Sequence, residues 1–312
     1  MQVAVLGAGA LGSVFGGFLA LSGHQVSLLG RPWHLDAINE HGLTIKGIWG
    51  EFLVENLDLN HSPQTLGSDY DLVLITVKGY QTEEMAALAS RISAPEGLII
   101  SLQNGVANGE ILLKKAGCER SAAGRVIFGA EIPAPGEVEV TVCADSVVLG
   151  PALAGSPEIL REKIRAAAEM INEAGIPCRF GDDVNTLLWA KAMYNCALNP
   201  LGALLGVNYG CLAADTNTCA IMNEVINEVF AVATAKGIRF TWPSAAGFQE
   251  EFYSRLIPTT AAHRASMLQD IERGKRTEID SLNGQIVRYG EELGVKTPVN
   301  KTLTALIKFR EH

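Results

Sequence analysis

The chain has 312 residues, of which 48% are hydrophobic and only 19% are charged. This length exceeds one ordinary hydrophobic core and fits two domains of about 150 residues each. The composition excludes disorder over most of the chain. Because the formal net charge is -9 and no basic run is present, we do not expect a nucleic acid, which is bound through its phosphates, as a partner.

The six cysteines show neither a CxxC motif nor paired metal spacing, and no His/Cys/Asp/Glu cluster has the spacing of a zinc site. A chain of this length does not need disulfides to fold. We therefore expect reduced thiols in a cytoplasmic protein, and no metal.

Residues 3–21 carry no charge and could be mistaken for a membrane helix or a signal peptide. Five glycines interrupt this stretch, at Gly7, Gly9, Gly12, Gly16 and Gly17. A soluble strand-loop-helix unit is the better interpretation, and no membrane partner is expected.

Short apolar runs alternate with helical patterns in the first half of the chain, which is typical of a parallel sheet covered by helices. The expected strands are Val3–Leu6, Gln25–Leu29, Leu72–Val77, Leu98–Leu102 and Arg125–Phe128. Two further runs, Val138–Val142 and Ser146–Leu149, suggest a hairpin at the far edge of this sheet.

A helix over Pro157–Ala174 and a short strand over Pro177–Phe180 complete the first half. Beyond residue 183 the pattern contains only helix-length periodicities, and the last two helices should cover Arg276–Leu293 and Asn300–Phe309. The sequence thus predicts an α/β protein with a Rossmann-type domain at residues 1–181 and an all-helical domain at residues 182–312.

The most specific local motif follows the first expected strand. Gly7, Ala8, Gly9, Ala10, Leu11 and Gly12 form a GxGxxG loop that opens a helical run. Such glycines permit a tight turn, close approach of the backbone to a pyrophosphate, and close packing of helix on strand. Because the motif follows an expected strand directly and opens an expected helix, we predict dinucleotide binding.

The second strand ends at Gly30-Arg31, where an NAD site would carry an acidic residue. An arginine there can pair with a 2′-phosphate. This favours NADPH, although a solvated arginine before a helix is the alternative. Two further loops follow strand ends: one contains Lys78 and Gln81, and the other contains Asn104. Each could contact a cofactor or be a simple surface loop.

The stretch 187–205 has only three strongly polar side chains, Lys191, Asn195 and Asn199, spaced i, i+4, i+8. They share one helix face, which suggests one side of a polar cavity rather than a narrow exposed stripe. Further on, Glu278 is expected in the first turn of a helix, where it could either complement the helix dipole or belong to a site.

Together these segments resemble the ketopantoate reductase (2-dehydropantoate 2-reductase) family along the whole chain. The matching motifs are GAGALG at 7–12, Arg31, VKGYQ at 77–81, LQNGV at 102–106, K-x3-N-x3-NP at 191–200, SMLQD at 266–270 and RTEIDSLNG at 276–284.

The resemblance implies NADPH-dependent reduction of 2-dehydropantoate to (R)-pantoate, in the synthesis of pantothenate and coenzyme A. It implies that Lys191 donates the proton, with Glu278 beside the substrate and the nicotinamide ribose. It further implies substrate contacts from Asn195, Asn199 and Ser266, and NADP contacts from the glycine loop, Arg31, Lys78, Gln81, Asn104 and Ala130.

The chain departs from the family pattern at one position. Family members often have another asparagine about 18 residues after the lysine, where this sequence has Asn208-Tyr209-Gly210. Asn208 could fill this position, and the substrate's side chain is left open. The alternatives among enzymes are a reductase of another 2-oxo acid and an opine-type dehydrogenase; a non-catalytic NADPH sensor that keeps the glycine-rich loop is the alternative from another class. The apolar helical domain is compatible with a homodimer.

Overall fold

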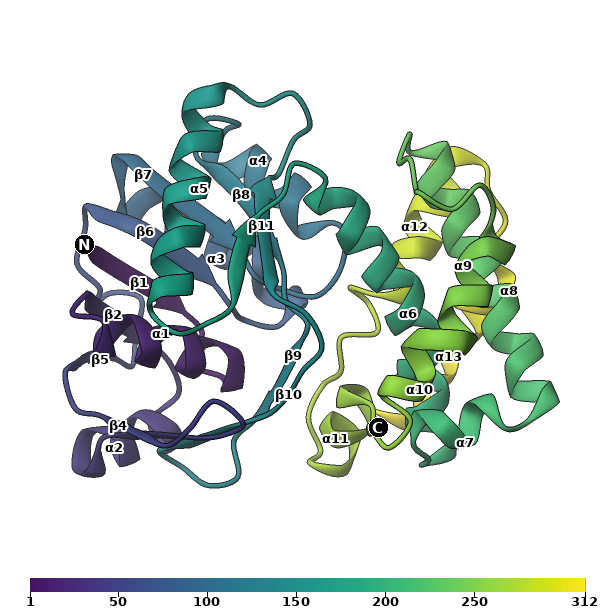
Figure 1. Ribbon diagram of the computed structural model, residues 1–312, viewed down its shortest axis with the longest axis horizontal. Helices are drawn as coiled ribbons and strands as arrows, with labels where there is room; N and C mark the ends of the chain where they lie inside the picture. Colours follow the sequence, from purple (N-terminus) through teal and green to yellow (C-terminus); the bar gives the residue numbers. More distant parts are fainter. Residues whose placement is uncertain (312) are drawn as a thin grey trace. The chain divides into compact units, whose positions relative to one another are not determined.

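The computed structural model describes residues 1–311, which form two compact units (Figure 1). The sheet unit contains Met1–Gln103 and Asn108–Asn185, and the helical unit contains Asn104–Ala107 and the chain from Thr186 onward. The break after Asn185 falls in the first turn of a helix, whereas the domain division expected from the sequence lies after residue 181.

The sheet unit is built on an eight-stranded sheet of order β12-β11-β8-β7-β6-β1-β2-β5. Its neighbouring strands pair in parallel except at β11 and β8, which are antiparallel. The strands are β1 (Gln2–Leu6), β2 (Gln25–Leu29), β5 (Leu57–Asn60), β6 (Tyr70–Ile75), β7 (Ser93–Ser101), β8 (Ser121–Arg125), β11 (Val147–Pro151) and β12 (Cys178–Phe180).

A second sheet of order β4-β3-β10-β9 belongs to the same unit. Its strands are β3 (Leu43–Gly47), β4 (Phe52–Val54), β9 (Phe128–Glu131) and β10 (Glu137–Cys143). The helices of the sheet unit are α1 (Ala10–Leu21), α2 (Pro32–His41), η1 (Gly79–Gln81), α3 (Thr82–Ile92), α4 (Asn108–Ala116) and α5 (Glu158–Glu173).

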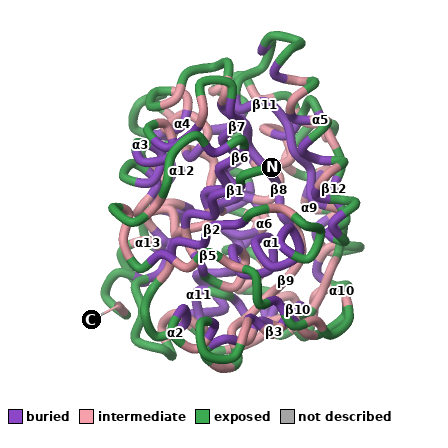
Figure 2. The backbone as a smooth tube through the Cα atoms, turned by 90° about the vertical axis from the view of Figure 1, so that its left-hand side faces the viewer, coloured by how far each residue is buried: buried purple, intermediate pink, exposed green. Residues whose placement is uncertain are grey.

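Alternate residues of β1 enter two different hydrophobic cores, as strand geometry requires. Val3 and Val5 pack with apolar side chains of α1, α2, α5 and the second sheet. Ala4 and Leu6 pack with apolar side chains of α3 and α4 on the other face. Both faces of the sheet are therefore covered. This explains why β1 and its neighbours are almost continuously apolar. Figure 2 accordingly shows buried backbone along β1, β6 and β7.

The helical unit contains no strand among the residues that the structure describes. Its helices are α6 (Val184–Leu205), α7 (Tyr209–Ala213), α8 (Thr216–Ala235), α9 (Ala245–Glu251), the π-helical turn η2 (Phe252–Leu256), α10 (Ile257–Thr259), α11 (Ser266–Glu272), α12 (Asn283–Leu293) and α13 (Pro298–Arg310). Their shared core includes Met193 and Leu198 of α6, together with Val229 of α8. Over residues 1–311, no helix is both long enough and apolar enough to cross a membrane.

The fold class predicted from the sequence is confirmed, but three of the expected elements are wrong. The expected strand at Arg125–Phe128 straddles the break between β8 and β9. The expected hairpin does not form, because β10 and β11 lie in different sheets. The helix expected to start at Arg276 begins at Asn283, since residues 276–282 form a turn segment. Strands β3, β4 and β5 were not predicted.

Candidate active site

The glycine-rich loop joins β1 to α1, and its three glycines have different local requirements. Gly7 has φ +121, and a Cβ there would lie 2.8 Å from the backbone nitrogen of Val77. A Cβ on Gly12 would lie 2.0 Å from the carbonyl oxygen of Gly7. A Cβ on Gly9, by contrast, would meet no atom within 4 Å. Gly7 and Gly12 therefore permit the tight turn, and Gly9 leaves open space in front of the helix.

That open space faces a helix end which can bind an anion. Gly9 is the N-cap residue of α1, and no side chain caps the helix there. Uncapped amides and the helix dipole favour a phosphate group at such an end. Ala10 and Leu11, in the first turn, are half-buried. The loop residues present thus fit the pyrophosphate of a dinucleotide.

Arg31 lies close in sequence to the point where β2 contacts this loop. The amides of Gly7 and Ala8 donate hydrogen bonds of 3.0 and 2.8 Å to the carbonyl oxygen of Leu29. Arg31 follows two residues later as the N-cap of α2, and it is exposed. An exposed guanidinium at this strand end fits a 2′-phosphate.

The loop after β6 leaves the same edge of the sheet, because β1 and β6 are parallel. Lys78 and Gln81 lie in it and are half-buried. Gln103, which the sequence analysis did not single out, holds this loop: its Nε2 donates to the carbonyl oxygen of Val77 at 2.9 Å and to Oγ1 of Thr82 at 2.8 Å. Ala130, the remaining expected cofactor residue, lies in β9 opposite Val140 and is half-buried.

Three of the predicted site residues meet in the helical unit. Nζ of Lys191 donates a hydrogen bond of 2.7 Å to Oδ1 of Asn104. Nδ2 of Asn104 donates one of 3.3 Å to Oε2 of Glu278. Asn104 thus bridges a cation from α6 and a carboxylate that is only 7% exposed. A half-buried ammonium with a buried carboxylate close by is suited to proton donation.

Glu278 is not in the first turn of a helix, because α12 begins only at Asn283. The interpretation that Glu278 complements a helix dipole is therefore wrong. It lies in the turn before α12, and its carbonyl oxygen accepts from the amides of Ser281 and Leu282. Thr277 anchors this turn, because both its amide and its hydroxyl donate to Oε1 of Glu311, at 2.7 and 2.6 Å. The turn, rather than a helix dipole, sets the position of the Glu278 carboxylate.

The three polar residues of α6 do not form an exposed stripe. Asn195 is 8% exposed and Asn199 is 4% exposed. The Asn195 side chain has no hydrogen-bond partner among residues 1–311, whereas Oδ1 of Asn199 accepts from the hydroxyl of Tyr209 at 2.6 Å. The unpaired amide atoms of these two side chains are not among the fully buried ones, so a ligand can reach them, which supports the interpretation of a ligand-binding face.

Ser266 and Asn208 lie near the C-terminal half of α6. Ser266 is the exposed first residue of α11. The preceding Ala265 packs on Gly202, where an added Cβ would lie 3.3 Å from the Ala265 Cβ. Asn208 is the N-cap of α7, and its side chain accepts a 3.0 Å hydrogen bond from the amide of Cys211.

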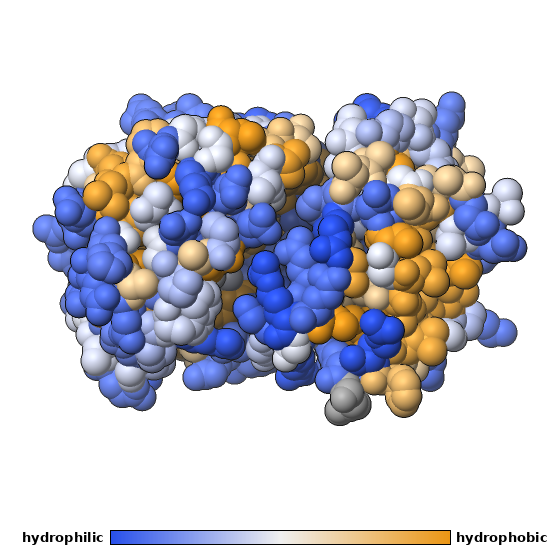
Figure 3. Space-filling view, turned by 90° about the horizontal axis from the view of Figure 1, so that it is seen from below, coloured by the Kyte–Doolittle hydropathy of each residue, from blue (hydrophilic) through white to orange (hydrophobic). Residues whose placement is uncertain are grey.

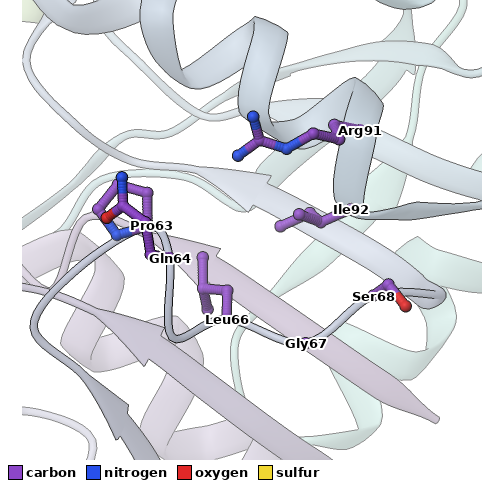
Figure 4. A pocket seen from close by; sticks show the side chains of 7 residues that line it. All are labelled: Pro63, Gln64, Leu66, Gly67, Ser68, Arg91 and Ile92. Carbon is purple, nitrogen blue, oxygen red and sulfur yellow. The ribbon is translucent and has the colours of Figure 1, made fainter.

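No group of three His, Cys, Asp or Glu side chains within the described part of the chain could hold a metal ion. A surface pocket of about 410 Å³ lies by the end of α3 (Figure 4). Its lining residues are Pro63, Gln64, Leu66, Gly67, Ser68, Arg91 and Ile92. None of them is a predicted site residue, so this pocket has no part in the proposed site.

The parallel sheet and its glycine-rich loop define a dinucleotide-binding protein of the Rossmann type with a separate helical unit. The family model described as "Ketopantoate reductase PanE/ApbA" matches residues 3–153, and the one described as "Ketopantoate reductase PanE/ApbA C terminal" matches residues 183–311. The chain therefore belongs to the ketopantoate reductase family.

Individual relatives agree along the full length. The 2-dehydropantoate 2-reductase of Aquifex aeolicus is 39% identical, and the match covers 100% of this chain and 97% of the relative. A crystal structure of a PanE/ApbA family ketopantoate reductase from Ralstonia eutropha has a TM-score of 0.86 and 35% identity, and the match covers 100% of this chain and 98% of that one.

A further similar structure has a different name. The ternary structure of D-mandelate dehydrogenase with NADH and anilino(oxo)acetate has a TM-score of 0.88 and 28% identity. The match covers 100% of this chain and 98% of that one. Structures that hold a nicotinamide dinucleotide are thus among the similar ones, and such a cofactor fits the glycine loop described above.

Proposed function

We propose that the chain is an NADPH-dependent 2-dehydropantoate 2-reductase, which makes (R)-pantoate for the synthesis of pantothenate and coenzyme A. The observation that supports this most is the Lys191-Asn104-Glu278 cluster, which adjoins two buried asparagines on the same helix as the lysine. In this proposal the sheet unit binds the cofactor, and the helical unit supplies the residues that bind and protonate the substrate.

When bound, the reduced nicotinamide supplies a hydride to the ketone carbon. Negative charge then develops on the carbonyl oxygen, and a nearby ammonium that can also release a proton stabilises it. We assign this role to Lys191. Asn104 accepts from the lysine, which orients Nζ, and it also donates to the carboxylate of Glu278.

The substrate's carboxylate and hydroxyl need hydrogen-bonding groups, and the buried stripe on α6 offers them. We assign Asn195 and Asn199 to this task, with Ser266 from α11. The side chain of Asn195 has no partner among the described residues, and a bound acid would supply one.

NADPH rather than NADH is the cofactor we propose, because Arg31 stands where an acidic residue would bind a ribose 2′-hydroxyl. Lys78, Gln81, Asn104 and Ala130 remain proposed cofactor contacts. A non-catalytic NADPH sensor would have no use for the lysine-centred cluster, so we favour the enzyme.

Reduction of another 2-oxo acid is a second candidate. One observation favours it: the similarity to D-mandelate dehydrogenase, whose ternary structure holds NADH and anilino(oxo)acetate. Tyr209, near the position where the family often has an asparagine, also departs from the pattern of 2-dehydropantoate reductases.

A panel of initial-rate assays separates these candidates. Purified protein is mixed with NADPH or NADH and with 2-oxo acids that differ in their side chain: 2-dehydropantoate, its analogue without the 4-hydroxyl, and phenylglyoxylate. We expect the highest kcat/KM with NADPH and 2-dehydropantoate. A preference for phenylglyoxylate, or equal rates with both cofactors, would contradict the proposal in its substrate or cofactor part.

We also propose a cytoplasmic enzyme, because all six cysteines are free thiols, as is usual in a reducing compartment.

A homodimer is the assembly we propose. Figure 3 shows apolar residues gathered on the face of the helical unit seen from below, and Phe309 in α13 is 79% exposed. Light scattering at several concentrations tests the assembly.

A further inference from the structure

Tyr209 makes a specific hydrogen bond to one of the proposed substrate-binding residues. Its hydroxyl donates to Oδ1 of Asn199 at 2.6 Å, and both residues are buried, at 2% and 4% exposure. Tyr209 comes from α7 and Asn199 from α6. The bond therefore joins two helices, and it is made to one of the polar residues of α6, Lys191, Asn195 and Asn199, that we assign to the substrate.

The tyrosine ring is held from several sides. It packs edge-on against Tyr194, with ring centroids 5.8 Å apart, and lies 5.3 Å from the ring of His263. Its backbone amide donates to the carbonyl oxygen of His263, and the next amide, of Gly210, donates to that of Ala261. Burial raises the pKa of Tyr209 above its ordinary value, so the hydroxyl stays protonated and can donate.

An amide side chain has one end that accepts and one that donates. In the structure Tyr209 donates to Oδ1, and this bond supports the orientation of the Asn199 amide in which Nδ2 is the other end. Nδ2 has no hydrogen-bond partner among residues 1–311, and neither has the amide of Asn195 one turn earlier. The two buried asparagines thus follow Lys191 along α6, and at least Asn199 is held as a donor.

We propose that Tyr209 is a positioning residue, which holds Asn199 with its NH₂ group available to an acceptor oxygen of the 2-oxo acid. This inference rests on the proposed function, because it takes the α6 stripe as the substrate site. The hydroxyl of 2-dehydropantoate can donate as well as accept, but the carboxylate offers only acceptor atoms, and it is the carboxylate that we place at Asn199. An Asn199 amide rotated by 180° would present its oxygen to them and repel the substrate.

Tyr209→Phe removes the hydroxyl and keeps the ring. The Asn199 amide then loses its fixed orientation, and we expect KM for the 2-oxo acid to rise about tenfold while kcat changes less than about twofold, the pattern of lost binding rather than lost chemistry. The Kd for NADPH should stay unchanged. A KM within about twofold of the wild-type value would overturn the proposal.

A double-mutant cycle with Asn199→Ala shows through which residue Tyr209 acts. If it acts through Asn199, Tyr209→Phe should have no further effect on KM once Asn199 is alanine. Additive effects would mean that the tyrosine touches the substrate directly or alters the fold, and would overturn the positioning role. If Asn199→Ala itself leaves KM unchanged, the assignment of the α6 stripe fails, which is a failure of the proposed function instead.

Tyr194→Phe is the matched control. Its hydroxyl also forms a side-chain hydrogen bond, to Oγ1 of Thr260 at 2.6 Å, and its ring lies in the same aromatic cluster. The variant loses a comparable bond without touching Asn199. We expect its melting temperature to fall as much as that of Tyr209→Phe, with KM unchanged. Equal rises of KM in both variants would contradict the proposal.

Discussion

A single amide, that of Asn104, connects the two charged residues of the candidate site. Its oxygen accepts from Lys191 and its nitrogen donates to Glu278, because one end of an amide side chain accepts and the other donates. The sequence predicted all three residues but not their contact, because Asn104 and Lys191 are 87 positions apart. The spacing of Lys191, Asn195 and Asn199 was predictable, since helical periodicity alone puts them on one face.

The proposed preference for NADPH over NADH depends on Arg31. Arg31→Ala should weaken NADPH binding by about 1.5 to 3 kcal/mol, the contribution of charge-assisted hydrogen bonds to a phosphate. NADH, which lacks the 2′-phosphate, should bind the variant and the wild type equally. Fluorescence titrations with both cofactors measure this, and an equal loss for the two would show that Arg31 does not bind the 2′-phosphate.

Among the helices, α6 contains a proline that leaves one backbone carbonyl without its helical partner, and a side chain of α12 donates to that carbonyl instead. Pro200 has no amide hydrogen, so the carbonyl oxygen of Cys196, four residues earlier, loses its helical partner. Nδ2 of Asn283 donates to this oxygen at 3.0 Å and to Oδ1 of Asn300 at 2.9 Å. Glu228 in turn accepts from the backbone and side-chain nitrogens of Asn300, at 2.9 and 2.7 Å. The network ties α8, α12 and α13 to the helix that carries Lys191.

Asn283→Ala should lower the free energy of unfolding by about 2 to 4 kcal/mol, because it leaves two buried acceptors unpaired. Pro200→Ala restores an amide that can bond the Cys196 carbonyl. It should therefore recover part of the loss in the Asn283→Ala background, as measured by urea denaturation. A double variant no more stable than Asn283→Ala would show that the proline does not create the need for Asn283.

His34 joins α1, α2 and the turn before β10. Its Nδ1 accepts from the amide of Gly136 and its Nε2 contacts Oγ of Ser13, both at 3.0 Å. Because Nδ1 accepts, Nε2 carries the proton and donates to the serine. The ring is fully buried, and burial lowers the pKa of His34 below its ordinary value.

The unfolded chain takes up a proton at His34 near pH 6.5, before the folded protein does. The contribution of the neutral, buried His34 to the free energy of unfolding is therefore fully present above about pH 6.5. It is lost as the pH falls below that value, at up to about 1.4 kcal/mol per pH unit. His34→Asn does not titrate there. Urea titrations at pH 8 and 5.5 should show a smaller pH effect for the variant than for the wild type, and an unchanged pH effect would contradict this role.

Prediction from sequence worked for elements with strong local signals and failed for the others. The buried strands β1 and β2 are continuous apolar runs, but β5 reads LDLN and its alternation is too short to detect. Strands β10 and β11 looked like a hairpin because they adjoin in sequence, yet each pairs with distant strands: β10 with β3 and β9, and β11 with β8 and β12. Such pairing depends on tertiary packing, which local patterns do not contain.

At the scale of the whole molecule, the proposed reductase divides its work between two units with separate cores. The sheet unit contains the glycine loop and Arg31, and the helical unit contains Lys191, Asn104 and Glu278. We propose that the helical unit supplies the proton donor, Lys191. It follows that cofactor binding and proton donation can be lost independently.

The most direct measurement is the steady-state rate of NADPH oxidation with 2-dehydropantoate by the wild type and by Lys191→Ala, alongside the Kd for NADPH of each. We predict that kcat falls about a hundredfold or more, because general acid catalysis contributes roughly 10² to 10⁴, while NADPH binds both proteins equally. A folded Lys191→Ala variant that turns over within a few-fold of the wild-type rate would contradict the assignment of Lys191 as the proton donor.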